Sequence, residues 1–332
     1  MSNASQDLVT VFGGSGFVGR HLVRALATRG YRVRVAVRRP DLAGFMQPFG
    51  SVGQIHPVQA NLRFPESVAR AVAGASAVVN LVGILAEGGA QSFTAVQDEG
   101  ARSVAQASAA AGVTRLVQMS AIGADVNSES AYARTKAAGE AAALEAIPGA
   151  VIVRPSIVFG PEDAFFNRFA ALARFAPALP LIGGGETRFQ PVFVGDVAEA
   201  IARAVDGTAR AGTVYELGGP EVKTFRELMQ YVLDTTGRRR PLVPMPFGMA
   251  KVQARILEAV KYATFGLLPE ALLITRDQVT LLEQDNVVSD AAIADGRTLA
   301  GLGIAPELIE SVVPSYLYRF RRNGQFDTSR YA

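Results

Sequence analysis

The sequence predicts an α/β protein built on a doubly wound parallel sheet, with a smaller and mostly helical C-terminal lobe. Two observations carry this prediction. In the first half of the chain, short runs of Val, Leu and Ile alternate with longer segments of helical periodicity, which is typical of a parallel sheet covered by helices on both faces. After Pro155 this alternation stops, and Pro and Gly become frequent between 160 and 190.

The expected elements follow from the apolar runs and from the helical spacing between them. Strands are expected over 8–12, 32–37, 55–59, 77–82, 116–119 and 151–153. Helices are expected over 17–29, 66–73, 92–111 and 131–146. After the break we expect a strand over 190–194, a helix over 196–205 and a strand over 214–217. The rest of the chain is expected to be mostly helical to about 320.

Composition excludes several classes of function. The chain of 332 residues contains no Cys and only two His, so thiolate catalysis, disulfide frameworks and Cys- or His-rich metal centres are excluded, and no metal is expected. The net charge of +3 is too small for attraction of the whole chain to nucleic acid, and we expect no such partner. The segment 1–7 is short and polar, and no apolar run is long enough to span a membrane. These features predict a cytoplasmic location.

The turn after the first expected strand is glycine-rich and leads into a helix. Its sequence over 13–20 is GGSGFVGR. Glycine permits a tight turn and close approach of the backbone to a pyrophosphate, while the helix N-terminus supplies free N–H groups and partial positive charge. The alternative is a glycine-rich turn that binds nothing. The order of strand, turn and helix favours a Rossmann-type dinucleotide site, whose expected residues are Gly13, Ser15, Gly16, Phe17, Val18 and Gly19.

The end of the second expected strand carries Arg38 and Arg39, where an acidic residue would hold a free ribose 2′-hydroxyl. A guanidinium group suits a 2′-phosphate because its planar fork matches phosphate oxygens. The alternative is an ordinary pair of solvated arginines. NADPH is therefore the preferred cofactor, and NAD stays open.

A serine, a tyrosine and a lysine follow the fifth expected strand with suggestive spacing. Ser120 ends the strand, and Tyr132 and Lys136 are four residues apart, so they share one face of the expected helix. A tyrosine can exchange a proton with a carbonyl or hydroxyl group, a neighbouring ammonium lowers its pKa, and a serine hydroxyl orients the substrate oxygen. Lys136 is the only Lys before residue 223, which makes a chance spacing improbable. The alternative is a Tyr and a Lys on a helix surface with no role.

These motifs together resemble the short-chain dehydrogenase/reductase superfamily, of the extended or atypical kind that includes NAD-dependent epimerases and dehydratases. The resemblance implies that Lys136 also contacts the nicotinamide ribose and that 155–158 line the nicotinamide. It places Asn61 where an Asp commonly meets the adenine amine. The cofactor residues that it implies are Asn61, Leu62, Leu81, Val82, Gly83, Met119, Tyr132, Lys136, Pro155, Ser156 and Val158.

Later motifs narrow the resemblance to one branch. They are QDEGA over 97–101, SAIGAD over 120–125, LEQDNVV over 282–288 and PSYLYRFRR over 314–322. The chain is similar there to the NADPH-binding Rossmann-fold accessory subunit of respiratory complex I and its bacterial relatives, with a sister group linked to ubiquinone biosynthesis. That branch implies complex I subunits or a quinone-related substrate as partners. It also implies that an intact Tyr132–Lys136 pair does not guarantee turnover.

We expect residues 1–160 to bind the dinucleotide, with 190–205 returning to this domain, and 161–332 to contact substrate or partners. In the second lobe, 247–264 has an amphipathic helical pattern with Val252, Ile256, Val260 and Ala263 on one face. Its alternatives are a helix packed on its own core and a docking helix for a membrane or partner. The RRR cluster over 238–240 is either a solvated turn or a site. The tail over 315–332 mixes Arg with aromatic residues, which is typical of interfaces.

Two functions remain open. The first is a nucleotide-binding accessory protein tied to the respiratory chain or to quinone metabolism, peripheral on the cytoplasmic face of the inner membrane. The second is an active NAD(P)-dependent epimerase, dehydratase or reductase that acts on a soluble small molecule. Sugar nucleotides are disfavoured as substrates because no tyrosine follows Ser120 closely.

Overall fold

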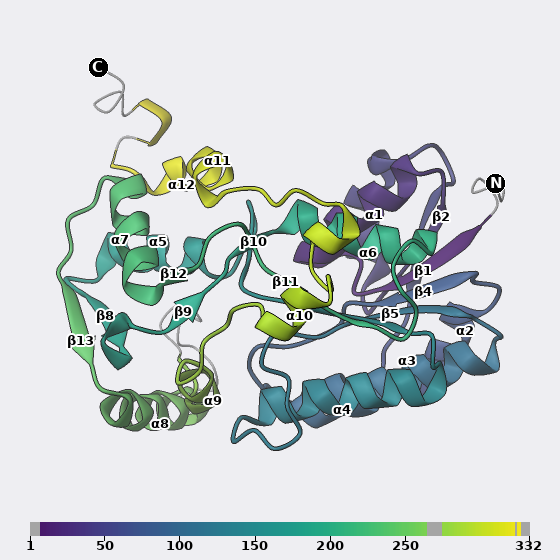
Figure 1. The fold of residues 1–332 in the computed structure, drawn as a ribbon, viewed down its shortest axis with the longest axis horizontal. Helices are drawn as coiled ribbons and strands as arrows, with labels where there is room; N and C mark the ends of the chain where they lie inside the picture. Colours follow the sequence, from purple (N-terminus) through teal and green to yellow (C-terminus); the bar gives the residue numbers. More distant parts are fainter. Residues whose placement is uncertain (1–6, 264–273, 323, 327–332) are drawn as a thin grey trace. The chain divides into compact units, whose positions relative to one another are not determined.

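The computed structural model describes residues 7–263, 274–322 and 324–326, and two compact units make up the fold (Figure 1). Unit 1 contains Met1–Pro155, Val194–Leu217 and Val288–Ala305. Unit 2 contains Ser156–Phe193, Gly218–Val287 and Pro306–Ala332. Unit 1 therefore includes 206–217 and 288–305, which were expected in the second lobe.

Unit 1 is built on one sheet of seven strands, and every pairing in it is parallel. The order is β11-β6-β5-β4-β1-β2-β3, so the direction of strand addition reverses between β1 and β4. Ligands bind at the carboxyl ends of the strands beside such a reversal. The expected doubly wound parallel sheet is confirmed. Its strands are β1 (Leu8–Phe12), β2 (Arg32–Val37), β3 (Ile55–Gln59), β4 (Ala77–Asn80), β5 (Arg115–Met119), β6 (Val151–Pro155) and β11 (Val214–Leu217).

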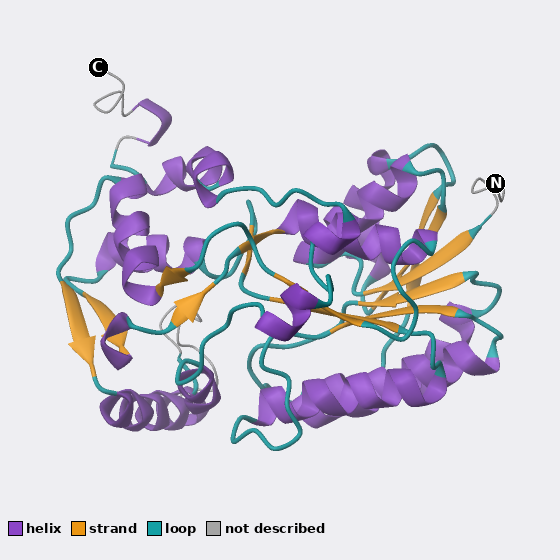
Figure 2. Ribbon diagram, viewed as in Figure 1, coloured by secondary structure: helices purple, strands orange, loops and turns teal. Residues whose placement is uncertain are grey.

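Helices cover both faces of this sheet (Figure 2). One face carries α1 (Phe17–Thr28) and α6 (Val194–Asp206), and the other carries α2 (Pro65–Val72), α3 (Glu99–Ala110) and α4 (Ala131–Ala146). The buried residues of α1, such as Leu22 and Leu26, recur at helical spacing because one stripe faces the strands. Short elements complete the unit, namely η1 (Pro40–Phe49), the π-helix η2 (Thr94–Asp98), α10 (Asp290–Ala294) and η5 (Ala300–Leu302).

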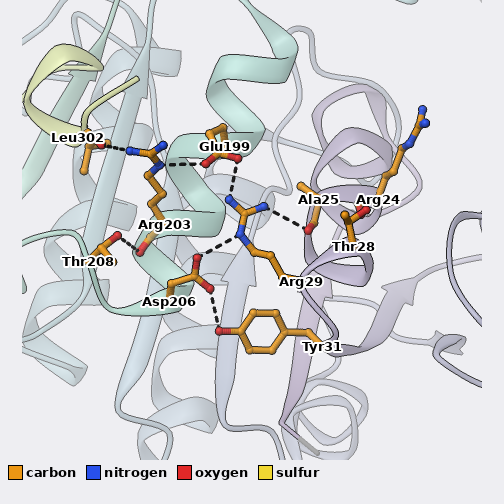
Figure 3. Close-up of polar contacts among 10 residues, drawn as sticks. All are labelled: Arg24, Ala25, Thr28, Arg29, Tyr31, Glu199, Arg203, Asp206, Thr208 and Leu302. Atoms are coloured by element: carbon orange, nitrogen blue, oxygen red, sulfur yellow. Dashed lines mark hydrogen bonds and ion pairs between the residues drawn. The ribbon is translucent and has the colours of Figure 1, made fainter. Parts of the chain in front are cut away.

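A polar network holds α6 against α1, and Figure 3 shows it. The guanidinium of Arg29 lies 2.7 Å from a carboxylate oxygen of Glu199 and 3.1 Å from one of Asp206. The hydroxyl of Tyr31 donates to Asp206 at 2.8 Å, and Nε of Arg203 lies 2.9 Å from Glu199. Both carboxylates belong to α6, which explains why this late segment returns to unit 1.

Unit 2 combines three two-stranded ladders with helices. The ladders are β7 (Val158–Phe159) with β10 (Val192–Phe193), β9 (Arg188–Phe189) with β12 (Lys223–Thr224), and β8 (Leu179–Ile182) with β13 (Leu242–Met245). The helices are α5 (Phe166–Phe175), α7 (Phe225–Thr236), α8 (Phe247–Ala263), α9 (Arg276–Leu281), α11 (Ile309–Val312) and α12 (Pro314–Leu317), with the short turns η3 (Gly183–Gly185), η6 (Tyr318–Phe320) and η7 (Gly324–Phe326).

Aromatic side chains form the core of unit 2, and the C-terminal segment joins them. Phe159, Phe166 and Phe225 are buried, and Tyr316 and Leu317 of α12 pack in the same cluster. The hydroxyl of Tyr316 donates to the carboxylate of Asp163, whose pKa is raised mainly by burial. Part of the aromatic tail therefore serves the core of its own unit, and residues 327–332 of that tail lie outside the described part.

Several expected elements differ in the structure. The helix expected over 92–111 is divided into η2 and α3, and the strand expected over 77–82 ends at Asn80. The strand expected over 190–194 is shortened to β10, because α6 already begins at Val194. In α8, the buried side chains are Ala250 and Ala254, whereas Val252 and Ile256 are 54% and 59% exposed. The side chains of Val260 and Ala263 and residue 264 lie outside the description. Among the described residues, no helix is both long enough and apolar enough to cross a membrane.

Candidate functional site

A cleft of about 490 Å³ opens in unit 1 at the carboxyl ends of β1, β2, β4 and β5. All of its lining residues belong to unit 1. Most of the residues singled out in the sequence meet there, although they come from segments that are far apart in the chain. The predicted residues that line the cleft are Gly13, Ser15, Gly16, Phe17, Val18, Gly19, Arg38, Asn61, Leu62, Leu81, Val82, Gly83, Met119, Ser120, Tyr132 and Lys136.

The glycine-rich turn is closed tightly against its own helix. Gly13 has φ +76°, and its carbonyl accepts a hydrogen bond from the N–H of Gly16 at 3.0 Å. A Cβ at Gly19 would lie 2.4 Å from the carbonyl oxygen of Gly13, so only glycine lets α1 start this close to the turn. No side chain caps the N-terminus of α1. Its first N–H groups therefore remain available to an anion in the cleft.

The two arginines after β2 differ in their surroundings. Arg38 is exposed and lines the cleft. Arg39 does not line it and instead pairs with Asp41, with 2.8 Å between Nη2 and Oδ2. The hydrogen bond from Arg39 lowers the pKa of the Asp41 carboxyl, and the pKa of Arg39 is raised in turn. Of these two arginines, Arg38 is thus the one placed to meet a negatively charged group in the cleft.

Buried amides fix the loop after β4. The side-chain amide of Asn80 donates to Oε1 of Gln118 on β5 at 2.9 Å, and its Oδ1 accepts from the N–H of Val82 at 3.1 Å. The chain then passes directly over Lys136. A Cβ at Gly83 would lie 3.0 Å from Nζ of Lys136, so a side chain there would crowd the ammonium group. The 81–83 segment and the lysine are therefore shaped to fit one another.

Ser120, Tyr132 and Lys136 meet at one end of the cleft. Ser120 is 3% exposed, and its Oγ is a buried polar atom with no hydrogen-bond partner in the described part of the chain. Tyr132 lies in the first turn of α4, and its ring packs edge-to-face on Phe93 at 5.8 Å. Nζ of Lys136 lies 5.8 Å from the Tyr132 ring centroid and donates to the carbonyl of Met119 at 3.3 Å. Because Ser120 also lines the cleft, its hydroxyl remains available for a hydrogen bond to a ligand.

Burial changes the titration of Lys136. Desolvation lowers the pKa of this ammonium to about 8, and the nearby carboxylate of Glu140, one helical turn further along α4, opposes that shift. Glu140 is itself held by Arg154, with 2.8 Å between Nε and Oε1 and 2.6 Å between Nη2 and Oε2. Lys136 thus remains mostly protonated at neutral pH, but it titrates much closer to neutrality than an exposed lysine.

Four predicted cofactor residues do not line the cleft, namely Arg39, Pro155, Ser156 and Val158. Pro155 ends β6 in unit 1, whereas Ser156 and Val158 belong to unit 2. Within unit 2 the hydroxyl of Ser156 donates to the backbone carbonyl of Asn286 at 2.8 Å. Other lining residues were not foreseen because they follow strand ends without a motif of their own. They include Arg63, Ile84, Leu85, Gln91 and Val96.

The cleft fits a dinucleotide on three structural grounds. The uncapped start of α1 suits a pyrophosphate, and the orphaned Ser120 hydroxyl and the buried Lys136 ammonium suit hydroxyl or carbonyl groups. Asn61 offers its side chain less freely than expected, because its Oδ1 accepts from the N–H of Arg63 at 3.2 Å. The strand order and the glycine-rich turn after β1 define the class of Rossmann-fold dinucleotide-binding proteins.

The chain belongs to the NAD dependent epimerase/dehydratase family, because a model of this family matches residues 9–218. It is homologous to the mitochondrial NADH dehydrogenase (ubiquinone) 1 alpha subcomplex subunit 9 of Arabidopsis thaliana. The two are 36% identical, and the alignment covers 97% of this chain and 80% of that protein. The resemblance to this branch is confirmed.

Other similar proteins are enzymes by name. The ceramide reductase of Caulobacter vibrioides is 32% identical, with 74% of this chain and 76% of that protein covered. The crystal structure of DesIV, a dTDP-glucose 4,6-dehydratase from Streptomyces venezuelae with NAD and TYD bound, has a TM-score of 0.67 at 21% identity. It covers 96% of this chain and 98% of that chain. At this identity the likeness concerns the fold.

Proposed function

We propose that this protein is a nicotinamide-dinucleotide-holding accessory protein, associated with complex I subunits or with a quinone-related substrate. The observation that carries the proposal is the 36% identity to a complex I subunit over 97% of the chain. A match that reflected only the nucleotide fold would end near residue 218, as the family match does. The similarity to the complex I subunit thus extends to the residues after 218, most of which belong to unit 2, and we assign unit 2 the contacts with partners or substrate.

The preferred cofactor in this proposal is NADPH. The N–H groups at the start of α1 would bind the pyrophosphate, Arg38 would bind the 2′-phosphate, and Lys136 would hold the nicotinamide ribose. Asn61 and Leu62 would border the adenine. Arg38 supports this assignment because it lies on the cleft without an ion pair among the described residues, and the residues that line the cleft include no Asp or Glu to accept a hydrogen bond from a 2′-hydroxyl.

The location proposed for the protein is the periphery of the inner membrane, on its cytoplasmic face. Two observations support it. The homologous subunits carry mitochondrial complex I names, and the tail of unit 2 combines exposed arginines with the exposed aromatic rings of Tyr318 and Phe326. Attachment of this kind depends on reversible contacts.

The test is copurification from native membranes, followed by identification of the bound nucleotide by mass spectrometry. We expect complex I subunits to accompany the protein and NADPH to be retained through purification. Titration of the nucleotide-free protein should show tighter binding of NADPH than of NADH. Recovery without membrane subunits and without nucleotide would overturn the accessory role.

A second candidate function is reduction of a carbonyl group, or the reverse oxidation of a hydroxyl group. It is favoured by the geometry of Ser120, Tyr132 and Lys136 and by the similarity to a ceramide reductase. A bound nicotinamide would supply or accept the hydride. Tyr132 would transfer a proton to or from the substrate oxygen, Ser120 would orient that oxygen, and Lys136 would keep the tyrosine acidic.

Tyr132→Phe separates the two functions. If the protein turns over a substrate, the change removes the proton donor and should lower kcat by about 10²–10⁴. Nucleotide binding should persist, whereas Lys136→Ala should weaken both. In the accessory role, Tyr132→Phe should leave respiration unchanged in a deletion strain complemented with the variant. A large respiratory defect at normal abundance and nucleotide content would favour catalysis.

A further inference from the structure

Six arginines of unit 2 gather on one surface, which we call the arginine face. They come from three separate segments, at the end of α5, after α7 and after η6. A cavity of about 450 Å³ lies among them and is lined by Arg238, Arg239 and Arg240, with Asp234 and Gln230 at its edge. The members of the arginine face are Arg174, Arg238, Arg239, Arg240, Arg321 and Arg322.

Helix ends explain how three of these arginines are held. Nε of Arg240 donates to the carbonyl of Ala173 near the end of α5 at 3.1 Å, and Nε of Arg321 donates to that of Thr235 near the end of α7 at 3.0 Å. Nε of Arg238 donates to the carbonyl of Phe320 at the end of η6 at 3.1 Å. Cations are favoured at helix C-termini, where carbonyl groups lack partners. These bonds use Nε and hold the remaining N–H groups in place for another acceptor.

Positive charge exceeds negative charge on the arginine face, where the cavity lining carries three arginines and one acid, Asp234. Within the described residues, none of its six members forms an ion pair, and Arg174, Arg239 and Arg322 make no hydrogen bond. The pKa of Arg238 is lowered, first by burial and then by the neighbouring charges of Arg174, Arg240 and Arg322. Asp234 borders the cavity as its one acid, and its Oδ1 accepts a hydrogen bond from Gln230 at 3.1 Å. Mutual repulsion of this kind is relieved when an anion binds.

An exposed phenylalanine accompanies these charges. Phe175 follows Arg174 at the end of α5 and is 81% exposed, and Cζ of Arg174 lies 5.4 Å from the centroid of its ring. A soluble phosphate compound would not need to contact this apolar ring. A bilayer surface accommodates both, because guanidinium groups meet anionic headgroups while an aromatic side chain enters the boundary of the acyl region.

We propose that the arginine face binds the anionic phospholipid headgroups of a membrane, with Phe175 entering the interface. This proposal rests on the peripheral attachment stated under the proposed function, and it names the surface and the chemistry that provide it. The charges contribute additively and are screened by salt, so binding should be reversible and dependent on ionic strength. A patch of an acidic protein is the competing partner, and the test separates it from lipid.

The experiment measures sedimentation of the purified full chain with vesicles. One set contains phosphatidylcholine alone, and the other contains phosphatidylcholine and phosphatidylglycerol in equal parts. The test variant is Arg174→Gln, Arg239→Gln and Arg322→Gln together, since these three make no hydrogen bond within the described residues. The matched control is Arg24→Gln, Arg70→Gln and Arg255→Gln together, which removes the same charge from exposed positions outside the arginine face whose guanidinium groups likewise make no hydrogen bond within the described residues.

We expect the wild type to bind only the anionic vesicles and to be released by high salt. The test variant should bind at least about tenfold more weakly, because each basic residue near an anionic surface contributes about a factor of five. The control should bind nearly as the wild type does. Phe175→Ser should weaken binding without changing its salt dependence, and inorganic phosphate at the same charge concentration should not compete as phosphatidylglycerol does.

Three results would overturn the proposal. They are no binding of the wild type to anionic vesicles at low salt, equal losses in the test and control variants, or unchanged vesicle binding in the test variant. If the test variant keeps vesicle binding but loses copurification with membrane subunits, an acidic protein is the partner instead. The vesicle experiment uses only purified protein and synthetic lipid. Its failure would therefore not decide the accessory role, which is tested separately by nucleotide binding and by copurification with membrane subunits.

Discussion

Two arginine-rich regions of this molecule use the same side chain in opposite ways. In the network of unit 1, Arg29 and Arg203 contact the carboxylates of Glu199 and Asp206 at 2.7 to 3.1 Å (Figure 3). On the arginine face of unit 2, guanidinium groups contact only backbone carbonyls or no protein acceptor within the described residues. An arginine with a carboxylate partner completes the fold, whereas one without such a partner retains binding capacity for something outside the chain.

The same contrast occurs on a smaller scale in unit 1. Arg39 pairs with Asp41 and lies off the cleft, whereas Arg38 beside it lines the cleft without an ion pair among the described residues. Lys136 is a stronger case, since its ammonium is buried in the cleft and forms no ion pair within the part of the chain that is described. We therefore expect substitutions of paired and unpaired cations to have different consequences.

Lys136→Met should produce the largest effect. Burial lowers the pKa of Lys136 from 10.5 to about 8, which corresponds to a cost of about 3 kcal/mol in the free energy of unfolding at pH 7. The cost is complete below pH 8, and stability should rise between pH 8 and 10.5, because the unfolded chain binds more protons there. Lys136→Met should stabilise the protein by up to about 3 kcal/mol at pH 7, remove this rise, and weaken nucleotide binding.

Urea unfolding from neutral to alkaline pH, together with calorimetric titration of NADPH, checks this expectation. Arg115→Met serves as a control, since this arginine donates to the carbonyl of Val205 and does not line the cleft. A wild-type stability that does not increase above pH 8 would contradict the assignment of a buried ammonium.

Arg38→Ala should reduce the affinity for NADPH by roughly 10- to 100-fold and leave the affinity for NADH nearly unchanged, because one charge-assisted phosphate contact is lost. Arg39→Ala should change neither affinity by more than about twofold, since its guanidinium is engaged by Asp41. Fluorescence titration with both nucleotides measures the preference. Equal losses from the two substitutions would show that the ion pair in the structure does not decide which arginine binds.

Arg29→Met should destabilise unit 1 by about 1–2 kcal/mol, because it removes charge-assisted bonds to two partly exposed carboxylates. The effect is limited because Glu199 retains Arg203 and Asp206 retains Tyr31. Thermal unfolding of the variant beside Glu199→Gln and the double variant gives the coupling energy. A coupling energy near zero would show that the contact between Arg29 and Glu199 contributes no more to stability than an exposed ion pair does.

Arg239→Gln should have the smallest effect on stability, within about 0.5 kcal/mol of the wild type, since its guanidinium makes no hydrogen bond within the described residues. A gain in stability is also compatible with relief of charge repulsion on the arginine face. A loss as large as that of Arg29→Met, measured by the same thermal unfolding, would mean that the arginine face is structural.

Much of unit 1 could be predicted from local sequence. The expected strands over 32–37, 55–59 and 214–217 and the expected helix over 131–146 coincide with the observed elements. Each of these strands contains Val or Ile, which favour extended backbone, although none of the three is apolar throughout. The glycine-rich turn was recognisable for a similar reason, since each of its glycines meets a local steric demand.

The buried face of α8 in unit 2 was harder to predict, because the 247–264 pattern allows either of two helix faces to pack against the core. The 247–264 pattern shows an apolar face with Val252 and Ile256, yet the structure packs the small side chains Ala250 and Ala254 against Ile182 and Val279. Close approach of α8 to its neighbours requires small residues, and no local rule states which face a neighbour will cover. The exposure of the larger residues emerged only from packing.

The sequence by itself determined the positions of the strand segments, the glycine-rich turn and the spacing of Tyr132 and Lys136, because each depends on residues close in the chain. The pairing of the strands joins distant residues, such as Val9 and Ala77. The tertiary structure decided the contacts of arginines whose partners are distant in the chain. Arg29 meets Glu199 across 170 residues, and Arg321 meets Thr235 across 86, so no local pattern records these contacts. Arg39 meets Asp41 only two residues away, whereas the folding of distant segments onto one another gave Arg29 its acidic partners and brought six arginines together on one surface.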